Sequence, residues 1–283
     1  MNSSKKVKDH RGSTITPSFI EAQQLFSKYS TLKTNVDLYN GLHDILSQDE
    51  INSYSMSNPR EIYNDVVLKY YSNEIAIKSC FINNVLLKTD GHVTIFELSV
   101  GGSRADLCKI NGTSIAYEIK TDLDNLQRLD KQLRDYMQIF EKVFVICSST
   151  KVSQIREHLI PECGIYSYSI SKNGIYRFKM EKVALASDRL DPSKQLSVLT
   201  KKEIITHFQM GTSQSKNEMI VRIESSVSNS RINSVFKNCM KLKYQKQWEF
   251  LKDNHQRIFE IDYQWFFKNT IDPSIIYSSE LHL

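Results

Sequence analysis

Residues 103–120 read Ser-Arg-Ala-Asp-Leu-Cys-Lys-Ile-Asn-Gly-Thr-Ser-Ile-Ala-Tyr-Glu-Ile-Lys, and the architecture of the chain is organised around them. Apolar residues alternate with polar ones on both sides of Asn111-Gly112, and this dipeptide is a strong hairpin signal. The sequence therefore predicts two antiparallel β-strands joined by a tight turn.

The charged residues of this hairpin are predicted to share one face of the sheet. Glu118 and Lys120 are two positions apart on a strand, so their side chains point to the same side. A connection over residues 111–113, with its glycine in the left-handed conformation, would place Asp106 directly opposite Glu118. A two-residue turn would place Tyr117 there instead. We expect the first arrangement, because only it brings the charges together.

An Asp, a Glu and a Lys on one sheet face indicate a metal site. Two adjacent carboxylates repel each other, and burying them without partners is costly. A divalent cation resolves both problems, and carboxylate oxygens suit Mg2+ or Mn2+, which fill the rest of their coordination shell with water and phosphate. The lysine would then hold a water molecule or stabilise charge on a phosphate. The alternative is a solvated strand face with a salt bridge, which Glu-x-Lys alone would favour.

Arg-Ala-Asp106, followed by Tyr-Glu118-Ile-Lys120, resembles the core motif of the PD-(D/E)XK nuclease superfamily. More narrowly, the central part of the chain from Asn73 to Cys147 resembles an uncharacterised bacterial and phage branch of that superfamily. The resemblance implies a restriction-endonuclease-like core, in which a small mixed β-sheet is flanked by helices, and metal-dependent hydrolysis of phosphodiester bonds.

The sequence departs from the family pattern at two positions. Ala105 stands where the superfamily name has Pro, and Leu98 replaces the Phe of the branch. Neither position is a metal ligand in the superfamily, so neither departure changes the expected chemistry.

The resemblance also assigns roles to individual residues of this chain. Asp106 and Glu118 would bind Mg2+ or Mn2+, helped by Glu74 and the backbone carbonyl of Ile119. Lys120 would position or activate the attacking water molecule.

Three further residues are expected to contact the substrate. Gln132 and Tyr136 match a Gln-x-x-x-Tyr pattern that the superfamily often carries on the helix after the Glu-x-Lys strand, and a side-chain amide and a phenol can hydrogen-bond a phosphate. Spacing alone would make Tyr136 a packing residue at the edge of the core and Gln132 a solvated one. Arg104, two positions before Asp106 on the same face, would contact phosphate.

Two more acidic residues lie among apolar neighbours. Glu74 is on the apolar face of a helix predicted over residues 73–87, so its carboxylate is expected to point inward and to need a partner. Either Lys78, one turn later, pairs with it, or it completes the metal site, as the resemblance favours. Glu97, on a strand predicted over residues 92–98, is a lesser candidate, either a group behind the metal ligands or an edge charge.

The remaining sequence predicts an α/β organisation with helical additions at both ends. The apolar run over residues 143–147 is typical of a buried parallel strand, and residues 166–178 are expected to form an edge hairpin. We expect three regions. Residues 1–57 would hold a basic tail and N-terminal helices, residues 58–186 the nuclease-like core, and residues 187–283 a helical C-terminal region.

Composition places the 283-residue chain among ordinary globular proteins with a mild net charge of +5. The sequence shows neither an apolar stretch long enough for a membrane span nor a signal peptide, and its five cysteines lack metal-binding spacing. We therefore expect buried free thiols, a cytoplasmic protein, and no zinc. In the C-terminal region, lysines interleave with Tyr244 and Trp248, either as a nucleic-acid face or, as we prefer, as an amphipathic helix whose lysines extend into solvent.

Together these features predict a metal-dependent nuclease that acts on DNA, in defence against foreign DNA or in processing of a mobile element. Two alternatives remain open. One is an RNA-directed nuclease, such as a toxin that cuts transfer RNA, and the other is a module that binds nucleic acid or assembles without cleaving it. A homodimer and a protein partner bound through the C-terminal helices are both compatible with the sequence.

Overall fold

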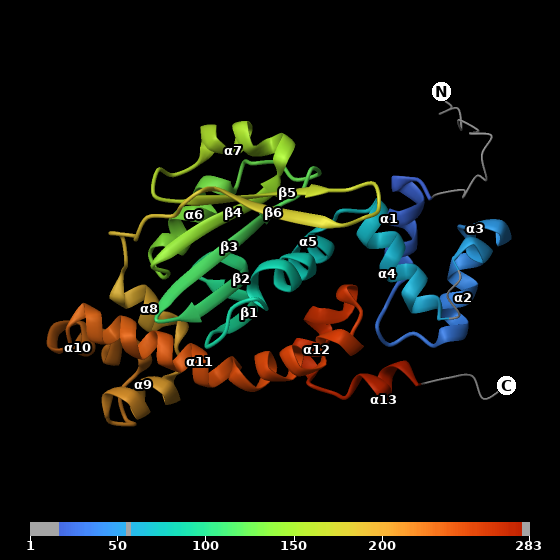
Figure 1. The fold of residues 1–283 in the computed structure, drawn as a ribbon. Coiled ribbons are helices and arrows are strands. Elements are labelled where there is room, and N and C mark those ends of the chain that lie inside the picture. Colours follow the sequence, from blue (N-terminus) through green and yellow to red (C-terminus); the bar gives the residue numbers. More distant parts are fainter. Residues whose placement is uncertain (1–16, 55–57, 279–283) are drawn as a thin grey trace. The chain divides into compact units, whose positions relative to one another are not determined.

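The computed structural model describes residues 17–54 and 58–278, which fall into two compact units (Figure 1). One unit comprises residues 73–270, and the other combines residues up to 72 with those from 271 onward. The basic segment from Met1 to Thr14 lies outside the described residues. The division of the chain at residues 57/58 and 186/187 stays a prediction.

The smaller unit is helical. Its helices are α1 (Phe19–Lys28), α2 (Asn35–His43), α3 (Gln48–Ser53), α4 (Pro59–Tyr70) and α13 (Pro273–Tyr277). A polar side chain caps the start of each helix, as Asn58 does before Pro59 at the first position of α4. The fully buried Arg60 donates hydrogen bonds to the carbonyls of Thr31 and Lys33, which offsets the cost of burying its charge.

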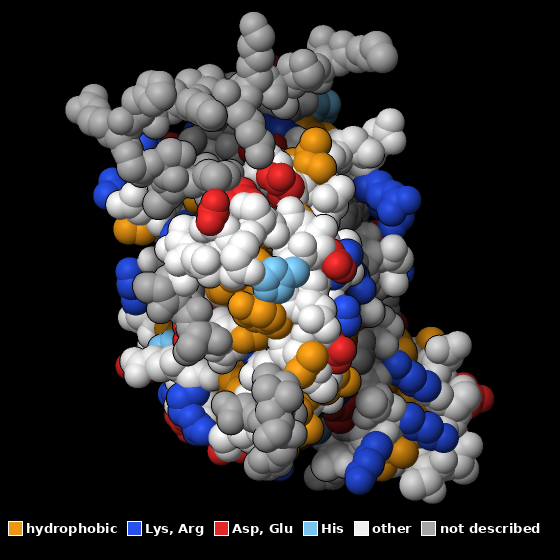
Figure 2. Space-filling model, turned by 90° about the vertical axis from the view of Figure 1, so that its right-hand side faces the viewer, with side chains coloured by type: hydrophobic (Ala, Val, Ile, Leu, Met, Phe, Trp, Pro, Cys, Tyr) orange, Lys and Arg blue, Asp and Glu red, His pale blue; other side chains and the backbone are white. Residues whose placement is uncertain are grey.

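Hydrophobic side chains remain exposed on this unit. Ile20, Leu32 and Ile275 are each more than 60% exposed. Figure 2 shows hydrophobic side chains exposed at the surface on the face that it views.

The larger unit is built on a six-stranded sheet with the spatial order β1-β2-β3-β4-β5-β6. Its strands are β1 (Val93–Val100), β2 (Ser103–Asn111), β3 (Thr113–Lys120), β4 (Lys142–Ser148), β5 (Gly164–Ile170) and β6 (Tyr176–Lys182). The pairs β3–β4 and β4–β5 are parallel, whereas the other neighbouring pairs are antiparallel. Helical crossovers between parallel strands bury β4 on both sides, which explains its continuous apolar run.

Helices cover this sheet (Figure 1). Helix α6 (Leu129–Met137) packs on β2 and β4, and α7 (Val152–His158) on β4, whereas α5 (Glu74–Phe81) packs on β3 and β6. A π-helical turn, Ile82–Leu86, extends α5. The prediction of a small mixed β-sheet flanked by helices, with helical N- and C-terminal regions, is confirmed.

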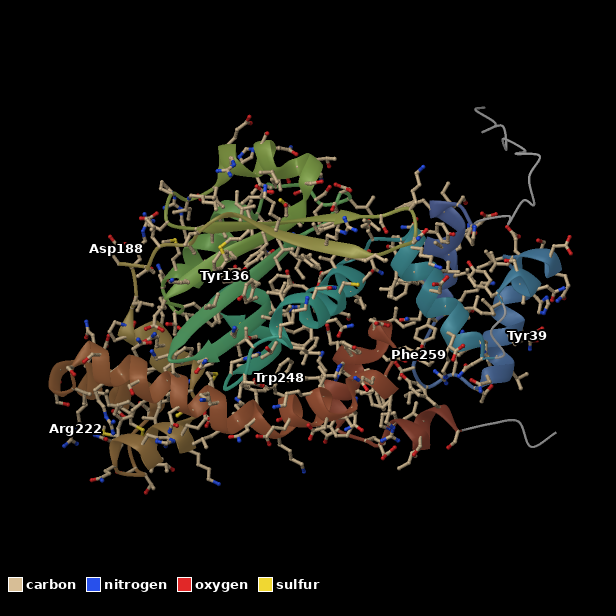
Figure 3. All side chains as sticks on the ribbon, viewed as in Figure 1. Tyr39, Tyr136, Asp188, Arg222, Trp248 and Phe259 are labelled. Atoms are coloured by element: carbon tan, nitrogen blue, oxygen red, sulfur yellow. The ribbon has the colours of Figure 1, made fainter. Side chains whose placement is uncertain are left out.

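The C-terminal part of this unit adds five helices along the β1 edge. They are α8 (Pro192–Val198), α9 (Lys201–Phe208), α10 (Lys216–Ser226), α11 (Asn229–Asn254) and α12 (Tyr263–Asn269). Trp248 of α11 is 2% exposed and packs on the ring of His92, just before β1 (Figure 3). Tyr244 stacks on Phe267. Both rings therefore serve packing, as the preferred interpretation of α11 expected.

Two further sequence predictions bear on the fold. All five cysteines are free and buried, as expected. Within the described residues, no helix combines the length and apolar character needed to cross a bilayer.

Candidate active site

The turn of the central hairpin has the predicted geometry. Asn111 pairs with Thr113, and Gly112 between them has φ +56°. This left-handed conformation is accessible to glycine at little cost, which explains the residue. The structure thus confirms the connection over residues 111–113 and the strand register that it fixes.

Asp106 lies where the two strands of the hairpin part. The ladder between β2 and β3 runs as far as the pair Leu107–Tyr117, and the next position along that register sets Asp106 opposite Glu118, as predicted. The Asp106 carboxylate enters the fork, where its Oδ2 accepts the backbone N–H of Ile119 at 2.7 Å. The interrupted ladder therefore makes room for a buried carboxylate inside the sheet.

Glu97 interrupts the ladder on the other side of Asp106. Strand β1 pairs Phe96 with Leu107 and Leu98 with Ala105, so that Glu97 is the residue opposite Asp106, but the ladder omits this pair. Glu97 has φ +57°, an unfavourable conformation for a residue with a long side chain, and such strain collects at functional sites. Its side chain is 8% exposed.

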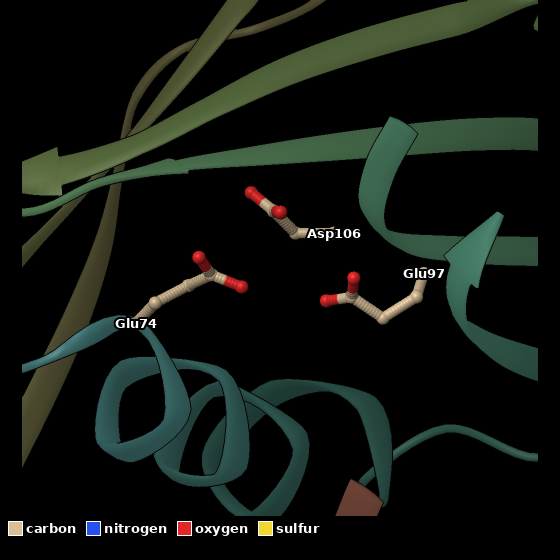
Figure 4. Close-up of side chains that lie close together, drawn as sticks. All are labelled: Glu74, Glu97 and Asp106. Carbon is tan, nitrogen blue, oxygen red and sulfur yellow. The ribbon is translucent and has the colours of Figure 1, made fainter. Parts of the chain in front are cut away.

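Three carboxylates converge at this point of the sheet (Figure 4). Glu74, Glu97 and Asp106 each offer an oxygen that lies within 4.8 Å of the others. Glu74 is the first residue of α5, where Asn73 caps the helix. Its side chain is 44% exposed, so the expectation that its carboxylate points inward is met only in part.

Glu97 is the member of this cluster that the sequence interpretation undervalued. The register of the hairpin sets Asp106 opposite Glu118, and the register of β1 sets Glu97 opposite Asp106. Glu97, Asp106 and Glu118 thus form one row across β1, β2 and β3. Extending the predicted register from the hairpin to the preceding strand would have placed Glu97 beside Asp106.

Lys78 holds two of the three carboxylates of this cluster. Its ammonium nitrogen lies 2.8 Å from Glu74 Oε1 and also bonds Glu97 Oε1, and it donates to Gln264 Oε1 at 3.1 Å. Lys78 therefore pairs with Glu74, as the spacing predicted, and Glu74 also belongs to the acidic cluster. Pairing with Lys78 and a place in a metal site do not exclude each other.

The second charged group surrounds Glu118. Lys120 donates to Glu118 Oε1 at 2.7 Å and to Gln132 Oε1 at 2.9 Å. The hydroxyl of Tyr136 lies 2.7 Å from Glu118 Oε2 and 2.7 Å from the carbonyl oxygen of Arg104. Both oxygens of Glu118 are thus engaged by neighbouring side chains, and Glu118 lies outside the acidic cluster of Glu74, Glu97 and Asp106.

Burial leaves this site with poorly compensated negative charge. Burial and the charges of Glu118 and Glu74 raise the pKa of Asp106 well above its usual value. Burial also raises the pKa of Glu118, although Lys120 and Tyr136 oppose that rise. For Lys78, burial lowers the pKa, but the charges of Glu74 and Asp106 outweigh it, so the pKa is raised.

A pocket of about 720 Å³ opens over these groups. Most of the predicted site residues line it, namely Glu74, Arg104, Asp106, Glu118, Ile119, Lys120 and Gln132. Arg104 is 63% exposed at the rim and pairs with Glu97 at 2.6 Å. Tyr136 (labelled in Figure 3) is fully buried and donates a hydrogen bond to Glu118, and its predicted contact with a substrate stays a prediction.

The donor set fits a hard divalent cation. Carboxylate oxygens are the ligands that Mg2+ and Mn2+ prefer. Opposite ligands of an octahedral Mg2+ lie about 4.2 Å apart, twice the usual bond length of ~2.1 Å. A small side-chain rotation would therefore close Glu74, Glu97 and Asp106 around one ion.

Comparison with known proteins places the chain in a family. The model of the family described as Bacteriophage P4 protein cII matches residues 69–263. The chain belongs to this family. The match to the cII family includes every predicted site residue, from Glu74 to Tyr136.

Two individual proteins are similar to parts of the chain. Protein cII of Enterobacteria phage P4 is 36% identical over 101 residues, which make up 36% of this chain and 38% of that protein. The match thus spans well under half the length of the curated relative. A solved structure, the SPO1766 protein of unknown function from Silicibacter pomeroyi, is 15% identical with a TM-score of 0.33, over 53% of this chain and 92% of that chain.

Proposed function

We propose that this chain is a metal-dependent nuclease of the PD-(D/E)XK type that hydrolyses phosphodiester bonds of DNA. The observation that carries the proposal is the convergence of Asp106, Glu118, Lys120 and Glu74 in one pocket at the fork of the hairpin. Glu97 lies beside Glu74 and Asp106 in the acidic cluster. We further propose that the protein acts in the cytoplasm and processes the DNA of a mobile element. The phage origin of a relative supports the second point.

The cofactor of the proposed enzyme is Mg2+ or Mn2+. Glu74, Glu97 and Asp106 would hold the ion at the fork. When bound, such an ion neutralises charge on a phosphate and lowers the pKa of water. The raised pKa of Asp106 supports this assignment, because a cation would supply the compensation that the site's own residues do not.

The residues of the chain would divide the remaining work. Lys120 is held by Glu118 and Gln132, so its ammonium group has a fixed position from which to orient a water molecule or stabilise charge on a phosphate. Tyr136 fixes Glu118 from behind. Arg104 at the rim would contact the phosphate backbone, because a guanidinium group suits phosphate oxygens.

The decisive experiment compares the wild type with Asp106→Ala and Glu118→Gln. We expect the wild type to cut plasmid or single-stranded DNA in Mg2+ or Mn2+, and both variants to lose cutting while they keep their fold by circular dichroism. Asp130→Ala is a matched control, since Asp130 is an exposed acid on α6 paired with Arg134.

Three results would change the proposal. Cutting of RNA alone would assign the site to an RNA-directed nuclease. Binding of nucleic acid without cutting would indicate a non-catalytic module. If the wild type cuts no DNA or RNA in either metal and Glu118→Gln changes nothing measurable, the nuclease proposal is wrong.

A further inference from the structure

Lys78 is more completely buried and more fully bonded than a lysine that meets a substrate. Its side chain is 1% exposed, and its ammonium group has three acceptors, on Glu74, Glu97 and Gln264. An ammonium group has three protons to donate. Each proton therefore has an acceptor within the protein, and Lys78 is suited to hold other groups in place rather than to contact a substrate.

The position of Lys78 is that of a cation between carboxylates. Two metal ions that share carboxylate ligands in a hydrolase site stand about 3.5–4 Å apart and neutralise those ligands together. At this site the ammonium group of Lys78 already bridges Glu74 and Glu97. It thus occupies the place, and supplies part of the charge, that a second metal ion would bring.

Counting charges gives the same result. The acidic cluster of Glu74, Glu97 and Asp106 holds three carboxylates, and Lys78 reduces its charge to that of two. One divalent ion balances the remainder. Glu118 is already paired with Lys120, so it does not leave charge for a second ion. Arg104 also pairs with Glu97, but it is 63% exposed, where solvent weakens the interaction.

We propose that Lys78 is a built-in cation that limits the acidic cluster to a single divalent metal ion and positions Glu74 and Glu97 around it. This inference rests on the proposed metal-dependent function and specifies it further. Lys78 is a positioning residue, since it acts on the metal through the two carboxylates that it holds.

The C-terminal part of the unit fixes this lysine. Gln264, on α12, supplies the third acceptor. The segment before it is bonded to α5 and its π-helical extension, because Ser79 donates to the carbonyl of Glu260 at 2.6 Å and Tyr263 donates to Asn83 at 2.8 Å. The C-terminal region therefore has a role in the site itself, in that it holds the helix that carries Glu74 and Lys78.

The test is the number of Mn2+ ions bound per chain, measured by isothermal titration calorimetry on the full chain. We expect one ion for the wild type and two for Lys78→Met, since removal of the ammonium group leaves an uncompensated carboxylate and an empty position beside it. Lys69→Met is the matched control. Lys69 also pairs with an acid four residues away, Asp65, but in the smaller unit, and this variant is expected to bind one ion.

A second variant keeps the inference testable if Lys78→Met does not fold. Gln264→Glu adds a carboxylate at the ammonium group of Lys78 and cancels its charge, and residue 264 is only partly buried. We expect this variant, too, to bind two ions.

The outcomes separate this inference from the proposed function. One ion in the wild type and still one in both variants would show that Lys78 is structural only, while the metal site would stand. Two ions in the wild type would overturn the proposed role of Lys78, while the metal site would again stand. No binding to the wild type would overturn the proposed function and this inference with it.

Discussion

Two acidic residues beside the same hairpin have opposite environments. Glu141, just before β4, accepts the backbone N–H of Ser114 at 2.6 Å, the side-chain amide of Asn233 at 3.0 Å and the ammonium group of Lys237 at 3.0 Å. Burial raises its pKa, but these donors outweigh burial, so the pKa of Glu141 is lowered. Asp106 at the fork receives the N–H of Ile119, yet its pKa is raised.

The difference separates the acid of the proposed metal site from an acid that we expect to serve only the fold. Both carboxylates lie against the sheet and both have lysines nearby, so a basic neighbour does not separate them. Burial separates them in part, because Asp106 is 7% exposed and the side chain of Glu141 is 23% exposed. The second distinction is whether the surroundings compensate the charge. Glu141 is compensated by hydrogen-bond donors, whereas Asp106 faces Glu118 and Glu74, as expected of a group that needs an external cation.

The largest expected effect comes from replacing the lysine that pairs with Glu118, next to Asp106, and it is compared with replacing the lysine that pairs with Glu141. Lys120→Met removes the cation beside Glu118 and should reduce the cleavage rate by about 10²- to 10³-fold, the usual cost of losing one fixed donor to a developing charge. Lys237→Met removes the cation beside Glu141 and should lower the melting temperature without changing the cleavage rate per folded molecule. Single-turnover cleavage and thermal melts of both variants provide the measurement.

The contrast between Asp106 and Glu141 fails if Lys237→Met loses cleavage and Lys120→Met loses only stability. A Lys237→Met variant that folds as well as the wild type but no longer cuts DNA would place Glu141 in the functional site. A Lys120→Met variant with full activity would mean that Glu118 and Lys120 on β3 serve only the structure.

Glu141→Gln is expected to have the next largest effect, a loss of about 1–2 kcal/mol in the free energy of unfolding. The change removes charge-assisted hydrogen bonds and breaks the ion pair with Lys237, and the partial exposure of Glu141 limits the loss. Because the folded pKa of Glu141 is lowered, its contribution is present above the unfolded value and is lost as the pH falls through the folded value. Urea unfolding at neutral and acidic pH should therefore show a difference between variant and wild type that vanishes in acid.

Much of the site could be predicted from local sequence patterns. Alternation around Asn111-Gly112 gave the register of the hairpin, and the register placed Asp106 opposite Glu118 with Lys120 on the same face. These relations depend on residues close together in the chain, for which strand periodicity and turn geometry suffice.

The remaining parts of the site depend on contacts that no local pattern contains. Gln264 meets Lys78 across 186 positions of the chain. The positive φ of Glu97 depends on how β1 leaves its ladder, and the full burial of Tyr136 depends on the packing of α6 against the sheet. Tertiary packing sets these features, so spacing within one helix or strand could not reveal them.

The smallest expected effect is a modest gain in stability from Asp106→Asn at pH 7. The raised folded pKa of Asp106 means that the folded state binds a proton more tightly than the unfolded state, so its ionisation destabilises the fold as the pH rises through the folded value. Asparagine removes this cost and can still accept the N–H of Ile119. Thermal melts without metal should show the gain at pH 7 and its loss near pH 3, whereas Asp130→Asn, an exposed acid with a lowered pKa, should show no gain at either pH. A lower melting temperature of Asp106→Asn at pH 7 would mean that the site compensates this carboxylate as well as it does Glu141, and the contrast between the two acids would then be lost.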